Sequence, residues 1–238
     1  MAENTPAPPC TSARTLARTL VFGDIHGCLL AFENILENIN LTEEDTIIFL
    51  GDYVDRGPDS KGVIDKIIQL RETYNVITLK GNHEEIMQLA DLSLSGYAWW
   101  RTVGGDITLR SFDCDVEDID QTYWDFIDSL KLYHETENHI YVHAGLKPNI
   151  PLTEQDEDTL LWLRFPQLKP HSSGKRIVCG HTPQRGAGLP TALPHAICVD
   201  THSYGALGYL TCLDMDTGDC YQANRNGKYR KEKIDLSI

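Results

Sequence analysis

Side chains that can bind a cation or move a proton recur in this chain just after short apolar runs. The runs "TLVF", "TIIFL" and "NVITL" each lead into a turn that carries glycine and polar residues, and "HIYVHAG" and "RIVCGHT" repeat the pattern with histidine. The candidate residues are Asp24, His26, Asp52, Asp55, Arg56, Asn82, His83, His143 and His181. Their carboxylate, amide and imidazole groups, without a thiolate, suit Mn²⁺, Fe or Zn²⁺ better than a soft metal.

The spacing within the first motif favours binding of one cation by two side chains. Asp24 and His26 are two positions apart, and side chains at that spacing point to the same side of an extended segment. They could therefore bind one cation. The alternative for any single residue is structural, because an aspartate after a strand often caps a helix or a turn. Recurrence of the motif at successive strand ends favours the metal site.

The elements that must position these residues can be read from the apolar pattern. The runs before the first three motifs are short and rich in β-branched residues, as expected of strands buried on both faces. Apolar residues at helical spacing separate them, over 29–39 and 63–70. Strand, helix and strand in alternation predict a parallel sheet, and active sites of such sheets gather at the carboxyl ends of the strands.

The remainder of the chain changes character twice. Residues 86–135 look mainly helical, with "YAWWRTVGG" interrupting, and the last third contains short strands with a hairpin turn at "DMDTGDCY". We therefore expect a single α/β domain over 18–225, in which two packed mixed β-sheets are flanked by helices. Residues 1–17 are expected to be disordered, and the basic segment 226–238 to be a solvated tail or a docking segment.

Composition and charge limit the possible partners and compartments. The 238 residues carry a formal net charge of −14, which disfavours a nucleic-acid binder. No run reaches the roughly 18 apolar residues of a membrane span, and residues 1–18 lack the apolar core of a signal peptide. Seven cysteines without a C-x-x-C pair are typical of reduced thiols. We expect a cytoplasmic protein that binds neither nucleic acid nor membrane.

Five short motifs carry a family resemblance. "GDIHG", "GDYVDRG", "GNHE", "HAG" and "GHT" occur in this order. The chain resembles the phosphoprotein-phosphatase family of binuclear metallophosphoesterases, particularly its bacterial and phage members, from about Leu20 to Ala223. The resemblance implies the calcineurin-like metallophosphoesterase fold and two divalent metal ions, with Mn²⁺ as the first choice and Fe or Zn²⁺ as alternatives.

The same resemblance assigns roles to matching residues. Asp52 would bridge the two ions, and the hydroxide that they generate would attack the phosphate directly. The first ion would be held by Asp24, His26 and Asp52, and the second by Asp52, Asn82, His143 and His181. His83 would act as the general acid, with Asp55 orienting it. Arg56 and Arg164 would bind the substrate phosphate, although Arg164 in "LLWLRFP" could instead form a structural ion pair.

Two departures from related families narrow the expected substrate. "GHTP" places Pro183 where nuclease-like relatives carry a further histidine. Diadenosine-tetraphosphate hydrolases resemble the chain but typically lack the second aspartate of "GDYVDRG", which is Asp55 here. Phosphoserine or phosphothreonine monoesters are thus the first prediction, with phosphotyrosine and aryl phosphates as further substrates and a phosphoprotein or phosphopeptide as the partner. Dinucleoside polyphosphates are the alternative.

Other features of the sequence allow more than one interpretation. A catalytically silent binding protein is a third hypothesis, which the complete set of motif residues disfavours. The segment "VGGDITLRSF" is similar to one found in bacterial relatives, but the residues alone assign it no role. Tyr97, Trp99, Trp100 and Arg101 could border a substrate groove or cap the core. The oligomeric state is not predicted.

Overall fold

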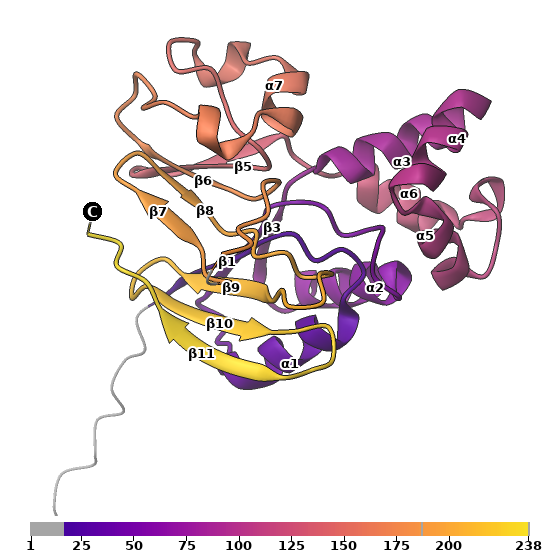
Figure 1. The fold of residues 1–238 in the computed structure, drawn as a ribbon, viewed down its shortest axis with the longest axis horizontal. Coiled ribbons are helices and arrows are strands. Elements are labelled where there is room, and N and C mark those ends of the chain that lie inside the picture. The colour runs from indigo at the N-terminus through magenta and orange to yellow at the C-terminus, as the bar shows by residue number, and fades with distance from the viewer. Residues whose placement is uncertain (1–16, 187, 238) are drawn as a thin grey trace, which may run out of the picture.

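The computed structural model describes residues 17–186 and 188–237 and contains two β-sheets that face each other. Figure 1 shows the two sheets stacked, with α1 and α2 on the outer side of one and α7 on the outer side of the other. The predicted fold, an α/β arrangement of two packed mixed sheets with helices outside, is confirmed. The N-terminal segment predicted to be disordered lies outside the described residues except for Ala17.

The larger sheet has six strands in the order β11-β10-β9-β1-β2-β3. Its parallel half, β1 to β3, contains the three apolar runs of the N-terminal region, and its antiparallel half, β9 to β11, comes from the C-terminal region. The strands are β1 (Thr19–Phe22), β2 (Thr46–Phe49), β3 (Asn75–Thr78), β9 (Leu210–Asp214), β10 (Asp219–Ala223) and β11 (Tyr229–Lys233).

The smaller sheet has five strands in the order β4-β5-β6-β8-β7. Its three central strands are parallel and its two edge strands are antiparallel to their neighbours. The strands are β4 (Tyr133–Glu135), β5 (His139–Val142), β6 (Arg176–Cys179), β7 (Thr191–Leu193) and β8 (Ala196–Cys198). The predicted strand segments of the last third therefore divide between the two sheets.

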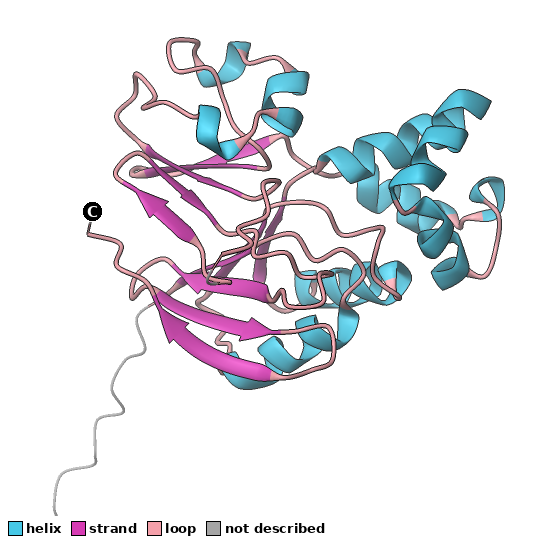
Figure 2. Ribbon diagram, viewed as in Figure 1, coloured by secondary structure: helices cyan, strands magenta, loops and turns pink. Residues whose placement is uncertain are grey.

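Helices cover the outer faces and form a separate group beside the sheets. Figure 2 shows α3 to α6 gathered at one end of the molecule, apart from α1 and α2. The helices are α1 (Leu29–Ile39), α2 (Ser60–Arg71), α3 (Asn82–Leu92), α4 (Leu94–Val103), α5 (Gly105–Phe112), α6 (Gln121–Asp128) and α7 (Glu157–Trp162), with short 3-10 turns at Val116–Asp118, Leu152–Glu154 and Phe165–Gln167. Among the described residues, none of these helices has the length and apolarity needed for a transmembrane span.

The core follows from the period of two along each strand. Leu20 and Phe22 of β1 pack toward α1 and α2, whereas Val21 between them packs into the layer between the two sheets. Ile48 of β2 and Val178 of β6 lie in the same middle layer. Both faces of each central strand are therefore buried, which explains why the runs are continuously apolar and identifies their carboxyl ends as the place where polar groups collect.

Two segments differ from the sequence expectation. "YAWWRTVGG" does not interrupt the helices, because residues up to Val103 belong to α4 and only Gly104 breaks the backbone, at φ 128°. The segment predicted as a solvated basic tail contains β11, which pairs with β10 along its whole length. Charge had suggested a tail, but Lys231 pairs with Asp219 at 2.8 Å across the two strands, so the basic residues have partners within the sheet.

Candidate active site

The loops that follow β1, β2, β3, β5 and β6 meet at one edge of the two sheets. The backbone N–H of His26 donates to the carbonyl of Asp52 at 2.8 Å, which joins the first loop to the second. Five of the candidate residues have left-handed backbones, with φ between 49° and 72°: His26, Asp52, Asp55, Arg56 and His181. Such conformations are uncommon for residues other than glycine and cluster at functional sites.

Asp52 lies between two imidazole groups. Its Oδ2 is 3.5 Å from Nε2 of His26, and its Oδ1 is 3.5 Å from Nε2 of His143. Asp24 belongs to the same centre, since one carboxylate oxygen of Asp24, one of Asp52 and one nitrogen of His143 all lie within 4.8 Å of one another. Each oxygen of the Asp52 carboxylate thus faces a different histidine.

The hydrogen bonds of two histidines fix which ring nitrogen faces the site. Nδ1 of His26 donates to the carbonyl of Val54 at 2.9 Å, and Nδ1 of His143 donates to the carbonyl of Leu50 at 2.9 Å. A neutral ring that donates from Nδ1 has its lone pair at Nε2. Both Nε2 atoms therefore present lone pairs to the Asp52 carboxylate, which is the orientation that metal-binding histidines adopt.

Asn82 and His181 are the remaining candidate ligands, and Asn82 contacts two of the histidines. Its Oδ1 lies 3.0 Å from Nε2 of His143 and 2.9 Å from Nδ1 of His181. The other ring nitrogen of His181 is buried and has no hydrogen-bond partner among the described residues. Acceptor atoms that converge in a buried cluster repel one another unless a cation lies between them. The donor set and its convergence fit a site for divalent metal ions, and they do not identify the metal.

The pKa shifts favour neutral histidines and an ionised Asp52 at this site. Burial lowers the pKa of His26 and His143, and burial with the nearby His143 lowers the pKa of His181 to about 3. Neutral imidazoles are the form that binds metal. Burial would raise the pKa of Asp52, but the surrounding imidazoles hold it below its ordinary value. Burial, Asp200 and Asp52 raise the pKa of Asp24, a crowding of carboxylates that a cation would relieve.

His83 and Asp55 form a pair beside the ligand cluster. Nδ1 of His83 lies 2.6 Å from Oδ2 of Asp55, and both side chains are buried. Burial lowers the pKa of His83, but Asp52 and Asp55 outweigh burial and raise it. The neighbouring histidines have lowered pKa values, so His83 is the one suited to donate a proton. One of its ring nitrogens also lies within 4.8 Å of ligand atoms of His26 and Asp52, so the positions alone allow His83 to be a ligand as well as an acid.

A cavity of about 280 Å³ opens over this cluster. Three arginines line it: Arg56, Arg164 and Arg185. Nη1 of Arg56 donates to the hydroxyl of Tyr204 at 2.6 Å, and Nη1 of Arg164 donates to the carbonyl of His181 at 3.0 Å. Among the described residues, no carboxylate lies within ion-pair distance of these three guanidinium groups. The structural ion pair considered for Arg164 is therefore not present.

Aromatic residues form one wall of the same cavity. The rings of Trp99 and Trp162 stack at 6.0 Å with an interplanar angle of 17°, and Nε1 of Trp162 donates to Glu85 at 2.8 Å. Trp99 is 41% exposed, whereas Trp100 beside it is fully buried. The two readings of the "YAWW" segment thus apply to different residues, because Trp99 borders the cavity and Trp100 belongs to the core.

Two buried acids at the site had no role in the sequence analysis. Glu84 accepts hydrogen bonds from the backbone N–H groups of Gly81, Asp52, Tyr53 and Val54 at 2.8–3.3 Å, so it ties the second loop to the third. Burial and Asp52 raise its pKa to about 7. The available signal was its place in "GNHE", next to the proposed acid.

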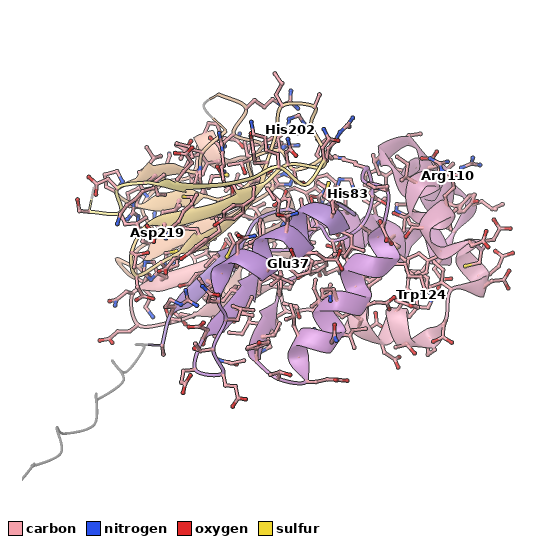
Figure 3. All side chains as sticks on the ribbon, turned by 90° about the horizontal axis from the view of Figure 1, so that it is seen from below. Glu37, His83, Arg110, Trp124, His202 and Asp219 are labelled. Carbon is pink, nitrogen blue, oxygen red and sulfur yellow. The ribbon has the colours of Figure 1, made fainter. Side chains whose placement is uncertain are left out.

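Asp200 is the second acid that the motifs did not indicate. It follows β8 and is buried, and its Oδ1 accepts the backbone N–H of His202 at 2.8 Å. Burial raises its pKa to about 6. Its position after a strand was a usable signal, since the ligand motifs also follow strands. Figure 3 shows His202 and His83 on the same side of the molecule, with His83 where the helical group meets the sheets.

Comparisons with known proteins give a family match and several relatives. A family model described as calcineurin-like phosphoesterase matches residues 17–206. A symmetrical bis(5'-nucleosyl)-tetraphosphatase of Nitrosospira multiformis is 32% identical over 133 residues, 53% of this chain and 43% of that relative. The serine/threonine-protein phosphatase 1 of Salmonella typhimurium is 35% identical over 95 residues, 40% of this chain and 42% of that relative. The matched segments span less than half of the length of these curated relatives.

Solved structures share the fold. A candidate diadenosine tetraphosphatase has a TM-score of 0.65 at 22% identity, covering 92% of this chain and 95% of that chain. A cold-active protein-tyrosine phosphatase of a Shewanella species has a TM-score of 0.63 at 17% identity, covering 91% of this chain and 80% of that chain. At these identities the likeness concerns the fold alone.

Proposed function

The chain belongs to the calcineurin-like phosphoesterase family, and from this premise we propose that it hydrolyses dinucleoside polyphosphates such as diadenosine tetraphosphate. This reverses the order of the two substrate hypotheses in the sequence analysis. Symmetrical tetraphosphatases recur among the curated relatives, and they support the former alternative better than the phosphoserine or phosphothreonine esters that came first.

The observation that carries this proposal is the charge of the cavity. Arg56, Arg164 and Arg185 face the ligand cluster without a carboxylate partner among the described residues, in a chain whose net charge is −14. Three guanidinium groups that have no carboxylate partner among the described residues exceed what one terminal phosphate needs, since a single planar guanidinium can bind a phosphate through two parallel hydrogen bonds. A chain of four phosphates offers partners for all of them. Trp99 lines this cavity and is 41% exposed, so its side chain offers an aromatic group on which a base could stack.

A second cavity lies beside the first and could hold the second nucleoside of a dinucleotide substrate. It measures about 360 Å³, shares Arg56 and Tyr204 with the first cavity, and is also lined by Arg225. The Arg56 guanidinium lies 4.6 Å from the centre of the Tyr204 ring, so the two side chains separate the cavities as one unit. Cavities on both sides of a phosphate-binding arginine fit a molecule that has a nucleoside at each end.

The proposed roles of the residues are those that the family resemblance implies, and the convergence of the side chains supports them. Two divalent ions, when bound, supply a hydroxide at neutral pH and offset the charge of the phosphoryl group, and Mn²⁺ is our first choice with Fe or Zn²⁺ as alternatives. Asp52 would face both ions. Asp24 and His26 would complete one ion's ligands, and Asn82, His143 and His181 the other's. His83 would donate a proton to the leaving oxygen while Asp55 holds its ring.

Phosphomonoester hydrolysis is the second candidate, and the Asp55–His83 pair favours it. A phosphate leaving group needs little protonation, whereas a serine or threonine alkoxide needs a proton as it departs. A buried acid held at 2.6 Å by a carboxylate is therefore of most use with esters. The match to a serine/threonine-protein phosphatase supports the same candidate, with phosphotyrosine as a further substrate to test.

A substrate panel with the manganese-loaded full chain tests the proposal. Diadenosine tetraphosphate should be hydrolysed with a higher kcat/KM than a phosphoserine peptide. In Arg185→Gln the kcat/KM for the tetraphosphate should fall by about 10-fold or more, the effect of losing one charge-assisted hydrogen bond, while that for p-nitrophenyl phosphate changes less. Arg110→Gln, at the exposed position labelled in Figure 3, is the matched control. A faster reaction with the peptide would establish the second candidate instead.

A further inference from the structure

Asp55 has hydrogen-bond partners beyond the histidine that it faces. Its Oδ1 accepts from Nε1 of Trp100 at 2.9 Å and from the hydroxyl of Thr108 at 2.7 Å. Its Oδ2 lies 2.6 Å from Nδ1 of His83 and accepts a longer bond, 3.2 Å, from the same Nε1 of Trp100. The backbone N–H of Asp55 also donates to Oγ1 of Thr108 at 2.9 Å. The carboxylate and its own peptide group are thus both held by the same threonine.

These donors come from helices that contribute no metal ligand. Trp100 lies on α4 and Thr108 on α5, and both side chains are fully buried. The two helices turn at Gly104, where a Cβ atom would lie only 2.7 Å from the backbone N of Arg56 and 3.1 Å from Cβ of Asp55. Its φ of 128° is also a conformation that favours glycine. Glycine therefore lets this turn approach the Asp55 loop closely.

We propose that Trp100 and Thr108 are positioning residues for the proton-donating pair. A buried carboxylate beside a metal site could rotate and become an additional ligand, because both of its oxygens can accept. Donors on Oδ1 from α4 and α5 hold the group in one orientation, in which Oδ2 meets Nδ1 of His83. The ring of His83 is then fixed with its other nitrogen toward the cavity. This gives the segment "VGGDITLRSF" a role that its sequence did not reveal.

A purely structural account makes a different prediction. A buried tryptophan needs an acceptor for its N–H group, and Asp55 could serve only that need. Loss of either donor would then lower stability and slow every substrate equally. The positioning role instead predicts a loss that grows with the need for a proton on the leaving group. This inference rests on the phosphoesterase chemistry proposed above, but not on which substrate is natural.

The kinetic test compares two aryl esters on the manganese-loaded full chain. Thr108→Val and Trp100→Phe should lower kcat by about 10-fold for phenyl phosphate, whose leaving group is a poor one, and by clearly less for p-nitrophenyl phosphate, with KM nearly unchanged. Thr108→Ser restores the hydroxyl and should recover most of the loss. Thr102→Val, at an exposed position of α4, is the matched control and should behave as the wild type. Equal losses with both esters would overturn the proposal.

A second readout does not depend on turnover. In the zinc-loaded protein, the proton between His83 and Asp55 should give a strongly downfield ¹H NMR signal, identified by its loss in Asp55→Asn. Thr108→Val and Trp100→Phe should shift or broaden this signal, and Thr102→Val should not. If both variants keep the wild-type signal, the donors do not position the pair. A wild type that hydrolyses neither diadenosine tetraphosphate nor any phosphate ester would refute the proposed function instead, and the signal would still decide the positioning role.

Discussion

The strand-end loops and the helices α4 and α5 contribute to one site in different ways. The loops contribute the side chains that converge on Asp52, and burial keeps three of their histidines neutral. The helices contribute two donors, Trp100 and Thr108, which hydrogen-bond the carboxylate of Asp55 and replace none of the ligands. The comparison teaches that residue type reveals the atoms that contact a ligand, whereas the groups that aim those atoms can come from any element that packs nearby.

Removing the shared carboxylate should have the largest effect on the loops. Asp52→Asn should abolish binding of both metal ions and reduce hydrolysis to background, because one carboxylate faces the ligands of both groups. Elemental analysis after manganese loading measures the ions bound per chain. If one ion remains at full occupancy, Asp52 does not bridge, and the two halves of the loop cluster bind independently.

The next largest effect should come from replacing His83, which lies where the loops meet the helical group. His83→Asn should keep both metal ions and lower kcat by roughly 10²–10⁴-fold, the usual contribution of a general acid. Elemental analysis and rates on phenyl phosphate should be measured together. Loss of an ion would show that His83 is a ligand. His83 would then belong with the metal-binding residues of the loops.

A smaller loss of metal affinity should follow from replacing Glu84, which holds the loops together but is not itself a proposed ligand. Glu84→Gln places an amide N–H group among backbone donors, which should weaken metal binding by about 10–100-fold and cost about 1–3 kcal/mol of unfolding free energy. Metal titrations and thermal unfolding with and without manganese measure both. Glu72→Gln, at an exposed position after α2, is the control. Unchanged metal affinity in the Glu84 variant would mean that the loops hold their shape without this tie.

The smallest effect on catalysis should come from a buried acid far from the site. Asp45 accepts hydrogen bonds from Arg18 at 2.6–3.1 Å, and these bonds with the N–H of Thr42 outweigh burial and lower its pKa. A lowered pKa means that this stabilisation is present above the ordinary value near 3.8 and is lost as pH falls through the lower folded value.

Asp45→Asn should therefore cost about 1–3 kcal/mol at pH 7, less in strong acid, and leave kcat unchanged. Denaturant unfolding of the variant and the wild type at pH 7 and in acid measures the difference. A reduced kcat at full folding would show that stability and catalysis are coupled across the sheet, and the variant could no longer serve as a reference for the site.

Much of the fold and the ligand set was predictable from the sequence for one physical reason. Strands buried on both faces are continuously apolar, so the first polar residues after them mark the sheet edge where Asp24, Asp52 and Asn82 meet. The pair of Asp55 and His83 was predicted from a family pattern and is present at 2.6 Å.

The residues that were missed are defined by tertiary packing. Trp100 and Thr108 lie 45 and 53 positions from Asp55 along the chain. In the sequence both look like ordinary buried positions of a helix. Glu84 looks like a helix residue until its carboxylate is seen to accept the N–H groups of a neighbouring loop. No local pattern records such contacts, because they depend on which loops and helices approach one another.

Strand β11 has a consequence for the behaviour of the protein in concentrated solution. It forms an edge of the six-stranded sheet, and an unprotected edge invites pairing with a second molecule and so aggregation. The exposed run Lys231, Glu232 and Lys233 places alternating charges along that edge. A chain cut before Tyr229 would expose the backbone of β10 in its place, and with it the apolar side chains of Cys220 and Tyr221. The charges of β11 thus disfavour pairing of this sheet edge with a second molecule.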